Sequence, residues 1–466
     1  MSESIRTELR ALTRLALPLA AAQAGTQLMG LVDVAVLGRL GATELGAAGL
    51  GNSLFFALAI LGMGIVMGID PLVSQALGAG EETQARRVLW QGVWISNAVG
   101  FGLMIPMALS PRLLPLLGIE QTLVEPAALY VRIRMLSLPF FMMFIALRAY
   151  LQAHGIVRPM IVAMVIGNVF NLVADVVLVF GGSVLPAWTG PLRSIPAYGV
   201  AGAAVASVVA AIVQLAVLAA AIRAIPLGSD APANLRAPDR RLFAQGMRVG
   251  LPVGFQMGAE VGIFALVGLI AGKFGEAPLA AHQVALTLAA FTFTAAVGIG
   301  AAGSVRVGRA IGARDREQTR RAGLAAFIGG GGFMAFMALL FWILPRQLSS
   351  LLTNQEPVIR IAIPLLAVAA VFQISDGIQG VGAGVLRGAG DTRFAFVANI
   401  IGHWLIGFPI ALLFGFVFDW GIVGLWWGLC VGLTAVAALL VHRFWRLSSK
   451  EIAPLDRSLP HLPAAG

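Results

Sequence analysis

Residues 74–87 read SQALGAGEETQARR, and residues 308–321 read GRAIGARDREQTRR. The two stretches are identical at six of fourteen positions, and they lie 308 − 74 = 234 residues apart. The same offset places Pro18 on Pro252. The chain is therefore one module of about 234 residues in two successive copies. In a membrane protein, an internal repeat of this kind is typical of a transporter.

The composition is that of a membrane protein. Hydrophobic residues make up 59% of the 466 residues, charged residues make up 12%, and the mean hydropathy is +0.89. A soluble globular chain carries about 25% charged residues. A segment of about 20 apolar residues crosses a bilayer core of about 30 Å. Twelve such spans are predicted, at residues 12–37, 45–77, 88–110, 127–153, 159–181, 197–222, 242–272, 279–311, 322–344, 358–386, 394–418 and 421–444.

The net charge of +10 is explained by membrane orientation and not by nucleic-acid binding. If the first span begins inside, 24 of the 32 Lys and Arg residues lie at inner ends and loops, and 8 lie outside. An excess of basic residues marks the cytoplasmic side. We therefore expect a multi-pass protein of the bacterial inner membrane with both termini in the cytoplasm.

The repeat also predicts the architecture. Six spans per half is an even number, so the second half enters the membrane in the same orientation as the first. The expected fold is an all-α polytopic membrane protein, in which twelve helices form two parallel-repeat lobes around a central cleft. The expected parts are an N-lobe (1–222), a cytoplasmic linker (223–241), a C-lobe (242–445) and a cytoplasmic tail (446–466).

Four carboxylates lie well inside predicted spans, namely Asp33, Asp175, Glu260 and Asp376. A charge at this depth costs several kcal/mol unless it faces water, a partner or a cation. None of the four has a Lys or Arg one turn away on its own helix, and we expect few basic residues at that depth. These acids are therefore candidates to exchange a proton, a metal cation or a cationic substrate.

Amide side chains accompany three of these acids at helical spacing, where residues three or four apart share a face. They are Asn171 before Asp175, Gln256 before Glu260, and Gln373 and Gln379 on either side of Asp376. Carboxylate and amide oxygens are hard ligands that suit Na⁺ or a proton relay. The acids are not repeated between the halves, so we expect the two lobes to have different chemical roles.

Five motifs resemble those of the multidrug and toxic compound extrusion (MATE) family, most closely its NorM branch. They are LVDVAVLGRLG (31–41), SQALGAG (74–80), LAAHQV (279–284), RGAGDTR (387–393) and HWLIGFP (403–409), and the resemblance covers nearly the whole chain. One departure is His403, where this family more often has Tyr. The resemblance implies a cation or proton site at Asp33, Asn171 and Asp175, and a cation site at Glu260 and Asp376.

The resemblance also implies a function. The chain is expected to be an antiporter that exports organic, often cationic amphipathic compounds across a lipid bilayer in exchange for Na⁺ or H⁺. Glu260 and Asp376 would hold the ion if it is Na⁺. No cofactor, nucleic acid or particular oligomer is implied. The amides expected to face the substrate cleft are Gln256, Gln283, Gln373 and Gln379.

Two alternatives compete with this function. A flippase for lipid-linked or polysaccharide precursors would need Arg and Lys in the cleft to meet phosphates, whereas the charges expected at mid-membrane are acidic. A polytopic membrane enzyme would need a clustered nucleophile, a histidine pair or an acidic metal motif at one membrane face. The sequence shows none of these, and we expect a transporter.

The topology can be tested by cysteine labelling in a Cys430→Ala background, which removes the only cysteine. Asp230→Cys should react with an impermeant thiol reagent only from the cytoplasmic side, because the linker follows the sixth span. Trp188→Cys should react only from the outside. Labelling of both positions from one side would contradict the twelve-span arrangement.

Overall fold

The computed structural model describes residues 3–116, 118–226 and 234–459, and every regular element in these ranges is helical. The N-terminal half contains α1 (Glu3–Leu37), α2 (Ala42–Val66), η1 (Met67–Ile69), α3 (Asp70–Gly78), α4 (Glu82–Leu109), η2 (Ser110–Arg112), α5 (Leu113–Leu116), α6 (Gln121–Arg134), η3 (Met135–Ser137), α7 (Leu138–Ala153), α8 (Arg158–Phe180), η4 (Gly182–Val184), η5 (Ala187–Ser194) and α9 (Val200–Arg223). The C-terminal half contains α10 (Arg240–Ala271), η6 (Gly272–Phe274), α11 (Glu276–Gly312), α12 (Arg316–Ile343), α13 (Pro345–Ser350), α14 (Glu356–Gly388), α15 (Thr392–Asn399), η7 (Ile400–Gly407), α16 (Phe408–Leu412), η8 (Leu413–Val417) and α17 (Gly421–Ser448).

The prediction of twelve membrane-spanning helices in two lobes is confirmed. Eleven helical segments of the described chain are long and apolar enough to cross a membrane, and α1, with 35 residues, supplies the remaining predicted span. Most helices run past the predicted apolar stretches. The first begins at Glu3 and not near residue 12, because amphipathic turns continue the helix beyond the hydrocarbon.

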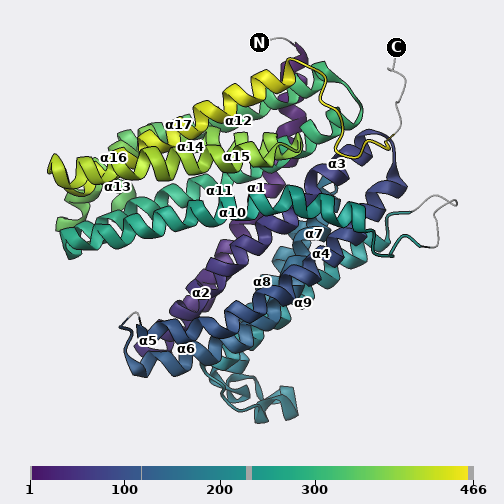
Figure 1. Ribbon diagram of the computed structural model, residues 1–466. Helices are drawn as coiled ribbons and strands as arrows, with labels where there is room; N and C mark the ends of the chain where they lie inside the picture. Colours follow the sequence, from purple (N-terminus) through teal and green to yellow (C-terminus); the bar gives the residue numbers. More distant parts are fainter. Residues whose placement is uncertain (1–2, 117, 227–233, 460–466) are drawn as a thin grey trace.

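The two lobes form a V (Figure 1). Helices α2 to α9 make one arm, and α10 to α17 make the other. The arms diverge toward α5, α6, α13 and α16, and they meet near α3, at the end where both termini lie. Helix α1 runs between the arms and packs against both α8 and α11.

Contacts between the lobes follow the sequence repeat. Helix α2 packs on α10, and the equivalent pair α11 and α1 packs in the same way. A Cβ atom added to Gly64 would lie 2.6 Å from the Cα of Gly254, and one added to Gly298 would lie 2.9 Å from the Cα of Ala20. Each of these pairs maps onto the other at the offset of 234, so the lobes are related by a pseudo-twofold axis, as the parallel repeat predicts.

The repeated stretches 74–87 and 308–321 pack against each other where the arms meet. A Cβ added to Gly78 in α3 would lie 2.0 Å from the carbonyl oxygen of Arg309, and one added to Gly312 in α11 would lie 2.0 Å from that of Gln75. Real Cβ atoms do not approach other atoms this closely, so only glycine permits the crossing. The pseudo-twofold axis therefore passes through this glycine crossing.

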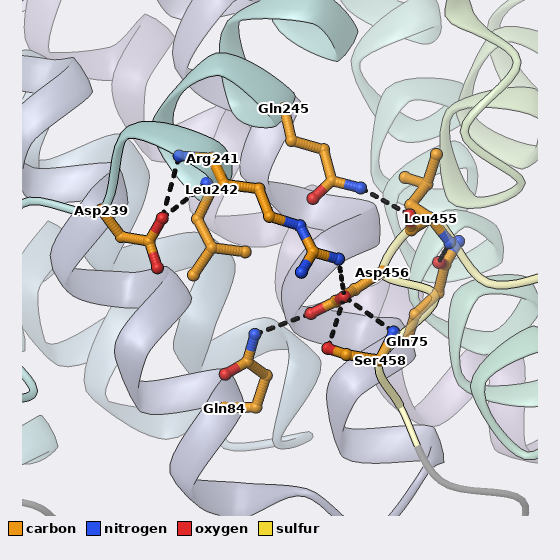
Figure 2. A network of polar contacts seen from close by, with 9 residues as sticks. All are labelled: Gln75, Gln84, Asp239, Arg241, Leu242, Gln245, Leu455, Asp456 and Ser458. Carbon is orange, nitrogen blue, oxygen red and sulfur yellow. Dashed lines mark hydrogen bonds and ion pairs between the residues drawn. The ribbon is translucent and has the colours of Figure 1, made fainter.

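The predicted linker and tail lie at the same end. Helix α9 ends at Arg223 and α10 begins at Arg240, while residues 227–233 of the linker and 460–466 of the tail lie outside the described residues. After α17, the tail folds back onto both lobes (Figure 2). Residues 455–458 and their contacts form the tail clasp.

The tail clasp contacts one lobe through α3 and α4 and the other through α10 (Figure 2). The Leu455 amide donates to the Gln75 side chain over 2.7 Å, and the Gln245 amide donates to the Leu455 carbonyl over 2.6 Å. Asp456 accepts from Gln84 at 2.7 Å and from Arg241 at 2.8 Å. The clasp therefore joins the two lobes at their meeting point.

Asp456 remains charged in this network. Burial would raise the pKa of its carboxyl group, but the Ser458 hydroxyl and amide donate to it, and the Arg241 guanidinium faces it. The net effect holds the pKa of Asp456 below its ordinary value. A lowered pKa contributes stability above the unfolded pKa and loses it only when the pH falls through the folded value. The clasp should therefore stay closed from pH 8 to pH 5.

A spin label at Arg457→Cys in the Cys430→Ala background tests the clasp, because Arg457 is exposed beside Asp456. The label should be immobile at both pH 8 and pH 5. Adding Asp456→Asn should make it mobile at both values, because the ion pair with Arg241 is lost. Equal mobility with and without Asp456→Asn would show that the carboxylate does not hold the tail.

Candidate functional site: a charged cavity between the lobes

A cavity of about 670 Å³ lies where the two lobes face each other. Its wall includes Gln23 from α1, Met67 from η1, Arg148 from α7 and much of α10, α11 and α14. Pockets of this size accommodate drug-sized organic molecules. Most of the wall is apolar, and its phenylalanines are Phe264, Phe293 and Phe372.

Two of the predicted acids, Glu260 and Asp376, line this cavity from α10 and α14. Glu260 accepts hydrogen bonds from the Gln379 amide at 3.1 Å and from the Asn399 amide at 3.3 Å. Glu260 is also the charge that acts on Asp376. Within the described ranges, neither acid has an ion-pair partner among Lys, Arg or His. In the described chain, Glu260 therefore accepts from neutral amides, and no basic side chain offsets the charge of either acid.

Three of the four predicted cleft amides lie in the cavity wall, namely Gln256, Gln283 and Gln379. The structure places Gln373 elsewhere. Its side chain is fully buried away from this wall and donates to the Thr292 hydroxyl over 2.5 Å. Gln373 therefore joins α14 to α11 and does not face a substrate in the cavity.

Asn399 was not identified from the sequence, and its position depends on a local change of helix type. It is the last residue of α15, and the chain continues as the π-helix η7. Gly402 and Gly407 of this segment lie against the backbone of Gly432 in α17, and the Trp404 indole donates to the Ala259 carbonyl over 3.2 Å. Segments of π-helix frequently occur at functional sites. Here the segment follows directly after the amide that faces Glu260.

The predicted N-lobe site is assembled from three helices. Asp33 in α1 lies beside Asp175 and Asn171 of α8, and the Ser207 hydroxyl of α9 is 3.5 Å from its carboxylate. Asn171 and Asp175 are fully buried, and their side-chain oxygens accept no hydrogen bond from a described donor. None of Asp33, Asn171 and Asp175 belongs to the wall of the central cavity. Asp33 and Asp175 form a separate carboxyl pair inside the N-lobe, with Asn171 beside them.

Basic residues lie closer to these acids than the sequence analysis expected. The charge of Arg134 at the end of α6 acts on Asp33 and Asp175, and its guanidinium lies 4.6 Å from the ring centre of Phe55. In the cavity wall, Arg387 of α14 pairs with Asp70 of α3 over 3.2 Å. These partners were not identified from the sequence, because spacing along one helix does not reveal partners on another.

The comparison with protein families agrees with the duplication. A family model described as MatE matches twice, at residues 18–177 and 252–413. The two matches start 252 − 18 = 234 residues apart, which is the offset of the repeat. The chain belongs to the MatE family. The expected family resemblance is thereby confirmed over both lobes.

Relatives of this MATE protein are named as multidrug resistance proteins. A probable multidrug resistance protein NorM of Pseudomonas putida is 33% identical over 450 residues, which cover 95% of both chains. Another from Deinococcus radiodurans is 36% identical over 465 residues, which cover 95% of this chain and 96% of that one. The family is one of transporters, and this chain is a membrane transporter and not an enzyme.

Solved structures share the fold. The eukaryotic MATE transporter AtDTX14 superimposes with a TM-score of 0.81 at 21% identity, covering 96% of this chain and 99% of that one. A structure described as the outward-facing conformation of a multidrug resistance MATE family transporter gives a TM-score of 0.83 at 20% identity. The match covers 97% of this chain and 100% of that one. At these identities the likeness concerns the fold alone.

His403, the departure from the family pattern, lies beside a phenylalanine of the cavity wall. It is buried in η7, and its ring centre is 6.3 Å from that of Phe264, which lines the cavity. Neither ring nitrogen has a hydrogen-bond partner among the described residues. The imidazole therefore packs as an aromatic ring at this position of the MATE fold.

The two kinds of buried acid should respond oppositely to neutralisation. Asp175→Asn should raise the free energy of unfolding by about 1–3 kcal/mol, because it removes one of two carboxylates that repel each other and supplies an amide donor to Asp33. Asp70→Asn should lower the free energy of unfolding by about 3–5 kcal/mol, because Arg387 loses its buried partner. Thermal unfolding of the purified protein in detergent measures both. Destabilisation by Asp175→Asn would contradict the assignment of Asp33 and Asp175 as a pair of carboxyl groups that repel each other.

Proposed function

We propose that this MATE transporter exports organic, often cationic amphipathic compounds by antiport with Na⁺ or H⁺ across the bacterial inner membrane. The observation that carries the proposal is the pair of Glu260 and Asp376 on the cavity wall. Amides hold Glu260, and neither acid has an ion-pair partner in the described chain. The names of the relatives support multidrug efflux. The large apolar cavity supports the substrate class.

The C-lobe pair is the proposed coupling site. Two carboxylates that face each other repel, so a cation or proton that binds between them lowers the free energy of both. The amide donors of Gln379 and Asn399 fix Glu260, and amide oxygens complete a set of hard ligands suited to Na⁺. Because both acids face the cavity, ion binding and substrate binding compete for the same charge.

The N-lobe pair is proposed as a second cation or proton site. Asp33, Asn171 and Asp175 are separated from the cavity, so substrate does not contact them directly. A proton shared between two carboxyl groups would remove their repulsion. Binding of this proton would then affect the substrate indirectly. Helix α1 packs against both α8 and α11, so it links this site to the space between the lobes.

The V shape supports alternating access. With the termini in the cytoplasm, as the charge asymmetry predicts, the arms in Figure 1 diverge toward the outside. The cytoplasmic end is closed by the glycine crossing and by the tail clasp. Export then requires this end to open and the outer end to close. An ion drives that change only if it binds one arrangement more tightly than the other.

The flippase alternative gains one supporting observation, since Arg148 and Arg387 lie in the cavity wall. The charge of Arg387, however, is matched by Asp70. The wall also carries Glu260 and Asp376, which would repel a pyrophosphate. We therefore favour organic amphiphiles as substrates.

The coupling assignment predicts that Glu260→Gln and Asp376→Asn each uncouple transport. Substrate should still bind within several-fold of wild type, because the apolar wall is intact. The imposed ion should no longer release it, because the carboxylate that both compete for is gone. Dye binding with and without Na⁺, and across pH 5–8, measures this release. Efflux from proteoliposomes with a Na⁺ or a pH gradient imposed separately identifies the ion.

Asp33→Asn and Asp175→Asn serve as the comparison. If these N-lobe variants lose efflux but the ion still releases bound substrate, the N-lobe pair acts in a separate step of transport. Wild-type release in either Glu260→Gln or Asp376→Asn would instead show that coupling rests on the N-lobe pair. Absence of gradient-driven efflux in the wild-type protein would refute the antiport itself.

A further inference from the structure

The cavity wall has an acidic region and a basic region. Glu260 and Asp376 form the acidic one. Asp70, Arg148 and Arg387 form the basic one, with two positive charges against one negative charge. The function proposed above uses only the acidic region.

Helix α14 sets the distance between these regions. Asp376 and Arg387 are eleven residues apart, which corresponds to about 16 Å of rise and just over three full turns. The two residues therefore lie on one face of α14, and both side chains line the cavity. An Arg side chain spans several ångströms, so the groups that a bound molecule meets are closer together than the backbone positions.

Arg148 is the cation without a matching charge in the basic region. The charges that act on it are those of Asp70 and Arg387, and Asp70 is already paired with Arg387. Its guanidinium donates to the Gln23 side chain over 3.3 Å, and its Nε atom has no partner within the described chain. No carboxylate of that part of the chain lies within ion-pair distance of Arg148, although a cation at membrane depth is costly without one.

We infer that Arg148 is an anion subsite of the substrate cavity, and that it binds the carboxylate of zwitterionic amphiphiles whose amine faces Glu260 and Asp376. A guanidinium binds a carboxylate through two parallel hydrogen bonds, which adds orientation to charge attraction. A molecule with both charges neutralises both regions of the wall at once. A purely cationic amphiphile leaves Arg148 uncompensated. This inference rests on the proposed export of organic compounds through the same cavity.

A matched pair of dyes tests the subsite. Rhodamine 110 carries a free carboxylate, and rhodamine 123 is its methyl ester, so they differ by one negative charge on the same aromatic body. The measured quantity is the ratio of the two affinities for purified protein in detergent. Arg148→Gln should lower the acid-to-ester ratio about tenfold, the effect of losing one charge-assisted interaction of about 1.4 kcal/mol. Arg148→Lys should retain much of the ratio, because the charge remains.

A second variant tests the subsite while keeping Arg148 unchanged. Gln152 lies one turn further along α7 and also lines the cavity, so Gln152→Glu supplies the missing carboxylate to Arg148. It should lower the ratio in the same direction as Arg148→Gln. Arg193→Gln, which removes an exposed Arg of η5 outside the cavity, is the matched control for net charge and should leave the ratio at its wild-type value.

An unchanged ratio in Arg148→Gln or in Gln152→Glu would overturn the anion subsite. An equal fall in Arg193→Gln would do the same, because it would show a general effect of net charge. These outcomes concern equilibrium binding in detergent. They are thus distinct from failure of the proposed antiport, which would appear as an absence of gradient-driven efflux of the ester by the wild-type protein.

Discussion

The arrangement of the lobes depends on one close backbone contact, in which Gly78 and Gly312 allow α3 and α11 to cross. A side chain at either position would collide with a carbonyl oxygen of the other helix. Because the contact lies where the arms of the V meet, it brings α3 against α14 and places Asp70 opposite Arg387. The same contact places Gln75 where it donates to the Gly388 carbonyl and accepts from Leu455 of the tail. The closed end is thus a set of polar contacts organised around two glycines.

The cavity above this crossing separates charges of opposite sign along one helix. In a medium with little water, an uncompensated charge is stabilised mainly by what binds to it. Under the proposals above, Glu260 and Asp376 and the unmatched Arg148 would therefore favour ligand groups of opposite charge. The apolar wall between them suits the hydrophobic body of a drug-sized molecule. Charge placement and cavity size together restrict the substrates more than either feature alone.

The duplication of the fold was not accompanied by duplication of the acids. The N-lobe pair is buried among α1, α8 and α9, whereas the C-lobe pair opens on the cavity. Equivalent helices thus perform different tasks on the same scaffold. The lobes share a pseudo-twofold scaffold, and under the proposed function their different acids would give them distinct ion chemistry.

The sequence by itself determined the twelve helices, the two lobes, their parallel relation and the acids at membrane depth. These features follow from apolar segment length, from the 234-residue repeat and from the energetic cost of a buried charge, all of which act locally along the chain. The tertiary structure decided which residues are partners. Asn399 and Glu260 are 139 residues apart, and Gln75 and Leu455 are 380 residues apart. It also separated Gln373 from the cavity and placed Arg148 in the cavity wall, where no carboxylate of the described chain forms an ion pair with it. Helical periodicity gives the face on which a side chain lies, but the helix that meets that face is chosen by packing across the whole molecule.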